Sequence, residues 1–329
     1  MITIRTPFRI SMGGGGTDIP SYYEQYGGHI ITAAINKYMY VSINESKTCN
    51  KIKLYYDKVE IVYDLNDIQH DIIRESLKLF DIKKPLEIAS MADIEAGTGM
   101  GSSSSFTVAL LAGLNILARK NISVHQLAEG ACHVEINGAG KKIGKQDQYI
   151  AAYGGIQEMD IVKNGMVTME SLPLKKDFIS ELEYRIVLFY TAIRRPAGLI
   201  LDKQSDDMRK DHGLAIKTMS RIKELGYEVK EALLSEDIDT LGRIFDTHWN
   251  EKKKVSKKMS GDNIDSWYNL GLTSGAIGGK VVGAGGGGFI MFVCKEGKKK
   301  DLIRTMELAG LRYMDFRFDF DGVKVIQNI

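Results

Sequence analysis

The sequence predicts two α/β-type domains, and its length, composition and patterning support this. The chain has 329 residues, which is enough for two ordinary domains. Apolar residues make up 44% of the chain, so each domain can bury a core. Strand-like segments dominate the first third, whereas strands and long helices alternate later. No Pro/Gly/Ser-rich linker separates the two parts. We place the boundary near residue 180, which gives domains of residues 1–180 and 181–329.

Hydrophobic periodicity locates the elements of both domains. Alternating β-branched and aromatic residues predict strands at residues 2–12, 38–45, 52–63 and 86–91. A buried helix is predicted after the serine run that follows Gly101, and another from about Ser123 to the glycines at 138 and 140. A short helix and a hairpin up to residue 168 follow. The second domain is predicted as a strand at 184–191, long helices between about 202 and 260, and a strand–glycine loop–strand unit at 279–293.

Charge and cysteine content exclude several classes of protein. Lys+Arg and Asp+Glu nearly cancel, 44 against 42, so we expect no nucleic-acid partner and no acidic membrane surface. The basic runs Lys252–Lys254 and Lys298–Lys300 are expected on solvated faces. Three scattered cysteines and six histidines show no disulfide framework and no metal-ligand spacing. Together with the absence of a signal-peptide pattern or a membrane-length apolar run, this predicts a cytoplasmic protein.

The segment Gly13–Gly16, which Thr17 and Asp18 follow, is the first of three candidate ligand-binding loops. It comes after a predicted strand, and its backbone can approach a ligand closely while Asp18 offers a carboxylate to a hydroxyl group. A plain turn is an equally good interpretation.

The second glycine segment, GTGMGSSSS at residues 97–105, is the most informative because it precedes the strongest helical pattern. A helix N-terminus presents unpaired N–H groups and the positive end of the dipole, so a glycine loop that leads into it forms a phosphate site. An N-cap serine explains only one of the four serines.

The third glycine segment, GAGGGG at residues 283–288, matches the dinucleotide pattern G-x-G-x-x-G. A strand and not a helix follows it, which excludes a Rossmann loop. A Walker A loop is excluded as well, since Lys145 is followed by glutamine and not by Ser or Thr.

Glu135 and Asp147 are the candidate carboxylates for phosphoryl transfer, which needs a divalent cation and a group that takes or orients the hydroxyl proton. Glu135 lies near the end of an apolar predicted helix. If it is buried there, its carboxylate needs a metal ion or a cationic side chain as partner; the alternative is a glutamate on the exposed face of the helix. Asp147 lies in a glycine-flanked loop and is equally consistent with an N-cap.

In this order, the three segments resemble the motifs of the galactokinase, homoserine kinase, mevalonate kinase and phosphomevalonate kinase (GHMP) family over essentially the whole chain. PFRISMGGGGTD, residues 7–18, is similar to the first motif of the sugar kinases. This resemblance implies that Arg9 is catalytic and that Asp18, with Gly16 and Thr17, binds the sugar. GTGMGSSSS is similar to the phosphate loop, and the implied phosphate-binding residues are Gly97, Gly99, Gly101, Ser102, Ser103 and Ser104.

The resemblance also implies a metal site and a base. Ser103 and Glu135 would bind magnesium (Mg2+), and Asp147 in GKQDQY would be the catalytic base. Gly285, Gly286 and Gly287 would belong to an active-site loop that packs against the phosphate loop. One departure is Glu95, where the family usually has proline. The implied fold is α+β, with a ribosomal-protein-S5-domain-2-like N-terminal domain and a ferredoxin-like C-terminal domain.

The implied activity is the transfer of the ATP γ-phosphoryl group to a sugar. The style of the motifs implies D-glycero-D-manno-heptose 7-phosphate as acceptor and its anomeric hydroxyl as the reacting group. A kinase for free fucose, arabinose or galactose is the alternative, and a non-catalytic regulator with the same fold is a further one. Arg194 and Arg195 are expected to help receive the sugar phosphate, with Lys37, Lys141 or Lys142 as rivals, and the alternative is that both arginines are solvated loop charges. The oligomeric state stays open, with a homodimer as one alternative.

Overall fold

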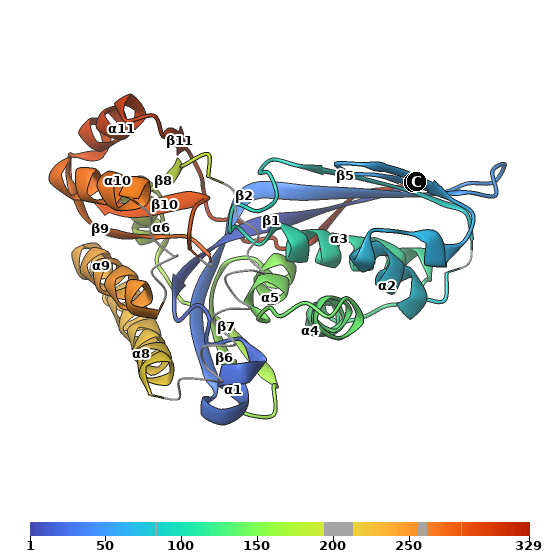
Figure 1. Ribbon diagram of the computed structural model, residues 1–329, viewed down its shortest axis with the longest axis horizontal. Helices are drawn as coiled ribbons and strands as arrows, with labels where there is room; N and C mark the ends of the chain where they lie inside the picture. The colour runs from blue at the N-terminus through green and yellow to red at the C-terminus, as the bar shows by residue number, and fades with distance from the viewer. Residues whose placement is uncertain (83, 194–212, 256–261, 284) are drawn as a thin grey trace.

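The computed structural model describes residues 1–82, 84–193, 213–255, 262–283 and 285–329, in which two separate sheets organise the chain (Figure 1). The first sheet has the strand order β12-β1-β2-β5-β3-β4, with β6 and β7 branching from β2. Its strands are β1 (Ile2–Gly13), β2 (Gly28–Glu45), β3 (Ile52–Tyr55), β4 (Val59–Val62), β5 (Leu86–Ala92), β6 (Ile156–Ile161), β7 (Val167–Ser171) and β12 (Lys324–Asn328). All of these pairs are antiparallel except β3 with β5.

The strand β2 holds the first sheet together because it pairs with three other strands. It has 18 residues and runs beside β1 from Ile31 to Ile43. On its other edge it pairs first with β6 and then with β5. The sequence predicted only its last part, from residue 38, because the earlier part is a continuous apolar run that lacks the period-2 alternation.

Helices cover one face of this sheet and carry much of the cavity described below (Figure 1). They are α1 (Pro20–Tyr26), α2 (Asp71–Leu79), α3 (Ser102–Leu117), α4 (Val124–Cys132) and α5 (Gln146–Tyr153). Two short segments, a 3₁₀ helix at Leu65–Asp67 and a π-helical turn at His133–Gly138, complete the set. The predicted start of α4 is confirmed: Ser123 and Gln126 form a capping box.

The second sheet has the order β11-β8-β10-β9, and all of its pairs are antiparallel. Its strands are β8 (Ile186–Tyr190), β9 (Ala276–Val281), β10 (Phe289–Cys294) and β11 (Arg312–Met314). The accompanying helices are α6 (Lys176–Arg185), α8 (Leu214–Leu234), α9 (Ile238–Val255), α10 (Asp262–Thr273) and α11 (Lys299–Leu308). Mainly antiparallel sheets with packed helices are the α+β arrangement that the resemblance implied, and not an α/β one.

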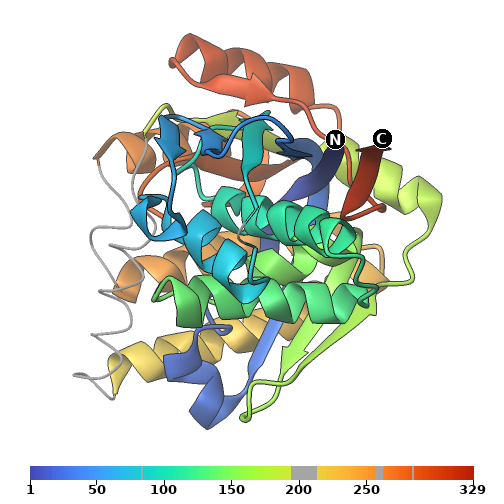
Figure 2. The same ribbon diagram turned by 90° about the vertical axis from the view of Figure 1, so that its right-hand side faces the viewer.

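The end of the chain returns to its beginning. β12 pairs with β1, and the Met1 amino group donates to the Ile329 carbonyl at 2.5 Å, so the two termini lie side by side (Figure 2). The chain passes from the first sheet to the second between β7 and β8, and it returns to the first sheet with β12. The boundary near residue 180 stays a prediction. Among the described helices, none has the length and apolar character that a membrane crossing requires.

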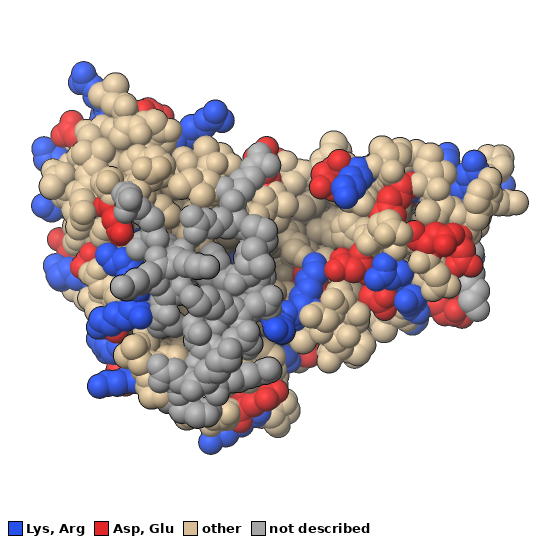
Figure 3. Space-filling view, viewed as in Figure 1, with Lys and Arg blue, Asp and Glu red and all other residues tan. Residues whose placement is uncertain are grey.

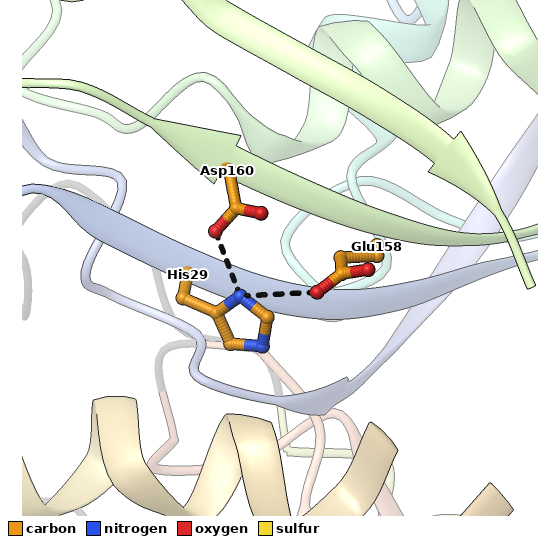
Figure 4. Close-up of side chains that lie close together, drawn as sticks. All are labelled: His29, Glu158 and Asp160. Carbon is orange, nitrogen blue, oxygen red and sulfur yellow. Dashed lines mark hydrogen bonds and ion pairs between the residues drawn. The ribbon is translucent and has the colours of Figure 1, made fainter. Parts of the chain in front are cut away.

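Helix α8 docks on the first sheet beside a cluster of polar side chains around His29 (Figure 4). His29 and Asp160 are cross-strand partners, and His29 Nδ1 lies 2.9 Å from Asp160 Oδ1 and 3.7 Å from Glu158 Oε1. From α8, the Tyr227 ring stacks on the imidazole at 3.7 Å and Lys230 Nζ lies 2.7 Å from Glu158 Oε2. These groups are close enough to hold a metal, but the Lys230 ammonium already neutralises Glu158. The cluster therefore has a structural role, which is to attach α8 to the first sheet.

Surface charge of both signs is interspersed over the described part of the face in Figure 3. Lys254 and Lys298 are exposed and pair with acidic neighbours, as expected for solvated basic runs. The expectation was wrong for Lys252, which is only 7% exposed. It lies on the inward face of α9.

Candidate active site

The first glycine loop connects β1 to α1 and buries the carboxylate of Asp18. Asp18 Oδ1 accepts a hydrogen bond from the Gly16 amide at 3.1 Å, and Oδ2 accepts one from the Gln146 amide at 2.9 Å. Burial raises the pKa of Asp18, although these two backbone donors oppose the shift. The carboxylate is thus fixed between the first loop and the start of α5.

Arg9 and Asp147 meet at the centre of the site, 138 residues apart in the chain. Arg9 Nε donates to Asp147 Oδ1 at 2.7 Å and Nη2 donates to Oδ2 at 2.8 Å, a bidentate pair. The third nitrogen, Nη1, donates to the Gly99 carbonyl at 2.5 Å. Asp147 is the second residue of α5, whose N-cap is Lys145, so the N-cap interpretation of Asp147 was wrong.

The second glycine segment leads directly into α3, as predicted. Gly101 has the left-handed conformation (φ 80°) and is the N-cap of α3, where no side chain caps the free amides. A side chain at Gly101 would also crowd Asp147, because an ideal Cβ would lie 3.2 Å from Asp147 Oδ2 and the carboxylate would have to shift by a few tenths of an ångström. The N-terminus of this 16-residue helix therefore faces the Arg9–Asp147 pair with its amide donors open to an anion.

Glu135 lies in the π-helical turn and is completely buried against α3. Ser103 Oγ donates to Glu135 Oε1 at 2.6 Å, while Ser104 Oγ and Gln148 Nε2 both donate to Oε2 at 2.7 Å. Lys141 Nζ is 3.9 Å from Oε1 and donates to Ser103 Oγ at 3.1 Å. Burial raises the pKa of Glu135 against these favourable hydrogen bonds. The exposed-glutamate interpretation was wrong.

The third glycine segment connects β9 to β10 and packs on the phosphate loop. An ideal Cβ on Gly283, whose φ is 75°, would lie 2.5 Å from the Gly99 carbonyl oxygen. Only glycine allows this approach. Gly285, Gly286 and Gly287 follow in the same loop, but Gly283 is the described residue of this segment that lines the cavity.

A cavity of about 600 Å³ unites these parts. One side, which we call the Asp18 side, is formed by Gly15, Gly16, Asp18 and Gln146, and the other by the phosphate loop with Glu135 and Lys141. The Arg9–Asp147 pair lies between the two sides, since Arg9 contacts Gly99 and Asp147 adjoins Gln146. The predicted residues that line it are Arg9, Gly16, Asp18, Gly97, Gly99, Gly101, Ser102, Ser103, Ser104, Glu135 and Asp147.

Among the described residues that were predicted to bind substrate, Thr17 does not line the cavity. Thr17 is fully buried, and its hydroxyl donates to the Gly14 carbonyl at 2.8 Å, so it shapes the loop without reaching the cavity. Arg194 and Arg195 lie outside the described residues. Of the rivals, Lys141 and Lys142 line the cavity, and Lys37 does not.

Lys252 lines the cavity and was missed by the sequence analysis. A signal was present: Leu241, Phe245, His248 and Trp249 are buried with helical spacing, and position 252 continues that face. We gave more weight to the run of lysines.

Comparison with protein families places this site in a class. Residues 68–155 match the GHMP kinases N terminal domain and residues 229–309 match the GHMP kinases C terminal domain. The chain belongs to the GHMP kinases. It is a phosphotransferase with an alcohol group as acceptor, in a family that uses ATP.

Individual relatives cover nearly the whole chain. It is 33% identical to D-glycero-alpha-D-manno-heptose 7-phosphate kinase of Campylobacter jejuni, over 98% of this chain and 99% of that protein. It is 25% identical to the galactokinase of Pyrococcus furiosus, over 92% and 91%. The crystal structure of a D-glycero-D-manno-heptose 1-phosphate kinase from Bacteroides thetaiotaomicron superimposes with a TM-score of 0.83 at 27% identity and full coverage of both chains. The family and the two-domain α+β fold are confirmed.

Proposed function

We propose that this protein transfers the γ-phosphoryl group of ATP to the anomeric hydroxyl of D-glycero-D-manno-heptose 7-phosphate, giving the 1,7-bisphosphate. The observation that carries the proposal is the Arg9–Asp147 pair between a buried carboxylate, Asp18, and an uncapped helix N-terminus. The relationship to the Campylobacter jejuni heptose 7-phosphate kinase supports this choice of acceptor.

The cavity offers each reactant a suitable surface. Asp18 accepts hydrogen bonds from sugar hydroxyls, while the amides at the start of α3 and the Ser102 hydroxyl donate to the phosphates of ATP. Asp147 keeps lone pairs beyond the two that Arg9 occupies, so its carboxylate can still take the proton of the anomeric hydroxyl. The sugar oxygen then forms the new bond to Pγ as the bond from Pγ to the ADP oxygen breaks. Arg9 stabilises the charge that develops on the transferred group.

A magnesium ion fits the Ser103–Glu135 pair because both residues supply oxygen ligands. Glu135 is a fully buried carboxylate on which three neutral donors converge, and a hard cation would compensate its burial. When bound, the ion would neutralise phosphate charge. Lys141 donates to Ser103 and lies 3.9 Å from Glu135 Oε1, so its ammonium compensates part of the Glu135 charge in this structure.

Product analysis tests the position of transfer. The protein is incubated with magnesium, ATP and the heptose 7-phosphate, and the products are followed by phosphorus NMR. We expect one glycosyl phosphate, labile in dilute acid, for each ADP formed. A second phosphate on a non-anomeric hydroxyl would refute the assignment, and transfer only to free sugars would favour the free-sugar alternative.

We propose a cytoplasmic location and a division of the chain near residue 180. We also propose that Arg194 or Arg195 receives the sugar phosphate, because arginine donates two parallel hydrogen bonds to such a group.

A further inference from the structure

Lys252 is a buried cation in the cavity that no described acidic side chain neutralises. It lies in the last turn of α9, and its Nζ donates a hydrogen bond to the Gly283 carbonyl at 2.8 Å. The other lysines of the same run behave differently, since Lys253 pairs with Asp265 and Lys254 with Glu251. An ammonium group has three donors, so two remain for a ligand.

Two other cations that line the cavity, Arg9 and Lys141, already have acidic partners. Arg9 is neutralised by Asp147 through a bidentate pair. Lys141 lies near Glu135 on the phosphate-loop side. The Asp18 carboxylate acts to raise the pKa of Lys252. Its oxygens, however, accept hydrogen bonds from backbone amides, and it forms no ion pair with Lys252. The charge of Lys252 is therefore uncompensated among the described residues.

Burial of this charge is costly, and the surroundings increase the cost. Burial and the Arg9 guanidinium lower the pKa of Lys252 to about 8. Lys280, on β9, is a second buried cation, and its Nζ donates to the Met12 carbonyl at 2.6 Å. Burial also lowers the pKa of Lys280 well below its ordinary value, with Lys252 contributing. An uncompensated buried cation is kept only where something offsets it, and an anionic ligand does so.

Among the described residues, the Gly283 carbonyl is the acceptor of the hydrogen bond from the Lys252 ammonium, and the buried groups beside it carry no negative charge. His248 lies one turn earlier on the same face of α9, and its buried ring nitrogens have no hydrogen-bond partner among the described residues. Burial lowers the pKa of His248 far below its usual value, so the ring is neutral. Lys280 is tied to β1 and covers the Phe245 ring. The free donors of Lys252 are therefore directed toward the cavity that it lines.

We propose that Lys252 binds phosphoryl oxygens in the cavity, beside Asp18 and the Arg9–Asp147 pair. Two sources carry this chemistry: the terminal phosphate of the sugar acceptor, and the phosphoryl group in transfer from ATP. The inference rests on the proposed function for the identity of these ligands. It deepens that proposal by assigning an anion-binding role to a residue of the C-terminal half of the chain.

Substitution at position 252 tests the role of the charge. Lys252→Met removes the ammonium and keeps the length of the side chain, whereas Lys252→Arg keeps the charge. Lys254→Met is the matched control, because Lys254 is exposed on the same turn. Values of kcat and KM are measured with the heptose 7-phosphate, with the free heptose and with ATP, and melting temperatures are recorded for every variant.

For Lys252→Met we expect kcat/KM to fall by about tenfold to a hundredfold, the effect of losing a charge-assisted hydrogen bond. Lys252→Arg should restore part of the loss, and Lys254→Met should match wild type. A loss confined to the phosphorylated sugar assigns Lys252 to the sugar phosphate, and a loss with both sugars assigns it to the phosphoryl group in transfer. The melting temperature of Lys252→Met should equal or exceed that of wild type, because a buried charge is replaced by an apolar side chain.

A kcat/KM of Lys252→Met within about twofold of wild type on every acceptor would overturn the inference, since a charge-assisted hydrogen bond is worth more than that. So would a loss that Lys252→Arg does not relieve and that follows a fall in melting temperature, because this pattern indicates a packing role. If wild type phosphorylates neither heptose, the proposed function fails, and Lys252 is tested separately by titration with inorganic phosphate. Wild type should then bind phosphate at least about tenfold more tightly than Lys252→Met at about pH 7, and equal binding would contradict the role.

Discussion

Replacing Asp147 with asparagine tests the chemistry of the site most specifically, because it removes the proposed base while the shape of the side chain is kept. The Asp147 carboxylate receives two nitrogens of Arg9, at 2.7 and 2.8 Å, and is 27% exposed as a side chain. In the Asp147→Asn variant, the new amide oxygen can still accept one of these hydrogen bonds. After the substitution, Arg9 therefore keeps its hydrogen bond to the Gly99 carbonyl and one of its two hydrogen bonds to residue 147.

The expected losses differ for activity and for stability. Loss of a general base lowers turnover by about 10²- to 10⁴-fold, which corresponds to about 3 to 5 kcal/mol in the barrier. Breaking a fully buried ion pair costs about 3–5 kcal/mol, but partial exposure of Asp147 and the remaining hydrogen bond reduce this to about 1–2 kcal/mol. For a protein of 329 residues the melting temperature should fall by about 1–3 °C.

The assay is single-turnover and steady-state ADP release, together with ATP titration and a thermal melt. We expect kcat to fall by at least about a hundredfold, with the Kd for ATP within a few-fold of wild type. Asp301→Asn, which changes an exposed carboxylate on α11, is the control and should leave both values unchanged. Turnover within about fivefold of wild type would remove Asp147 from the proton transfer, since a general base contributes far more. A melting temperature too low for the folded state to persist would show a structural role.

Three further predictions concern the metal, the pH profile and the sugar phosphate. Ser103→Ala and Glu135→Gln should each weaken productive magnesium–ATP binding, with partial rescue by excess magnesium; unchanged magnesium dependence in both would contradict the assignment. Because the pKa of Lys252 is lowered to about 8, its ammonium is present below that pH and lost above it. The value of kcat/KM should therefore fall above about pH 8 and level off at the loss of about tenfold to a hundredfold that is expected for Lys252→Met. If a Lys252→Arg variant shows the same fall above about pH 8, the fall belongs to another group. Either Arg194→Ala or Arg195→Ala should lose about tenfold or more in efficiency with the phosphorylated sugar and little with the free sugar; equal losses on both would indicate a structural role.

The same lysine predicts how stability depends on pH. Above about pH 8 the free energy of unfolding should rise, whereas kcat/KM should fall. The folded-state pKa of Lys252, about 8, lies below its ordinary value of 10.5, so protonation is less favourable in the folded state than in the unfolded state. Below about pH 8 the buried charge therefore costs stability, and this cost disappears as the pH rises from about 8 to 10.5. A stability advantage of Lys252→Met should accordingly be largest below about pH 8.

Local signals in the sequence predicted the elements that carry the phosphate site. Gly101 ends the loop where the N-terminus of α3 begins, because glycine tolerates the left-handed conformation there. Ser123 and Gln126 mark the start of α4 with a capping box. Such features depend on a few neighbouring residues and can be read directly from the chain.

Contacts between distant segments were not accessible in the same way. Nothing local indicates that β12 pairs with β1, or that Ser104 and Gln148 converge on Glu135. The bidentate Arg9–Asp147 pair likewise depends on how β1, α3 and α5 pack. The roles of these residues came from the resemblance to a family and not from spacing.

Lys252 shows how two local signals can conflict. A run of lysines favours a solvated face, while the helical period of the buried residues before it favours the core. The burial of the rest of α9 decides the orientation, because the helix must cover β9 and β10.

We propose that the acceptor is a sugar that already carries a phosphate. Initial rates of ADP release at saturating magnesium and ATP, across a panel of free sugars and sugar phosphates, test it most directly. We expect kcat/KM for D-glycero-D-manno-heptose 7-phosphate to exceed that for the unphosphorylated heptose, fucose, arabinose and galactose by at least about tenfold. A higher kcat/KM for any of these free sugars would contradict the claim.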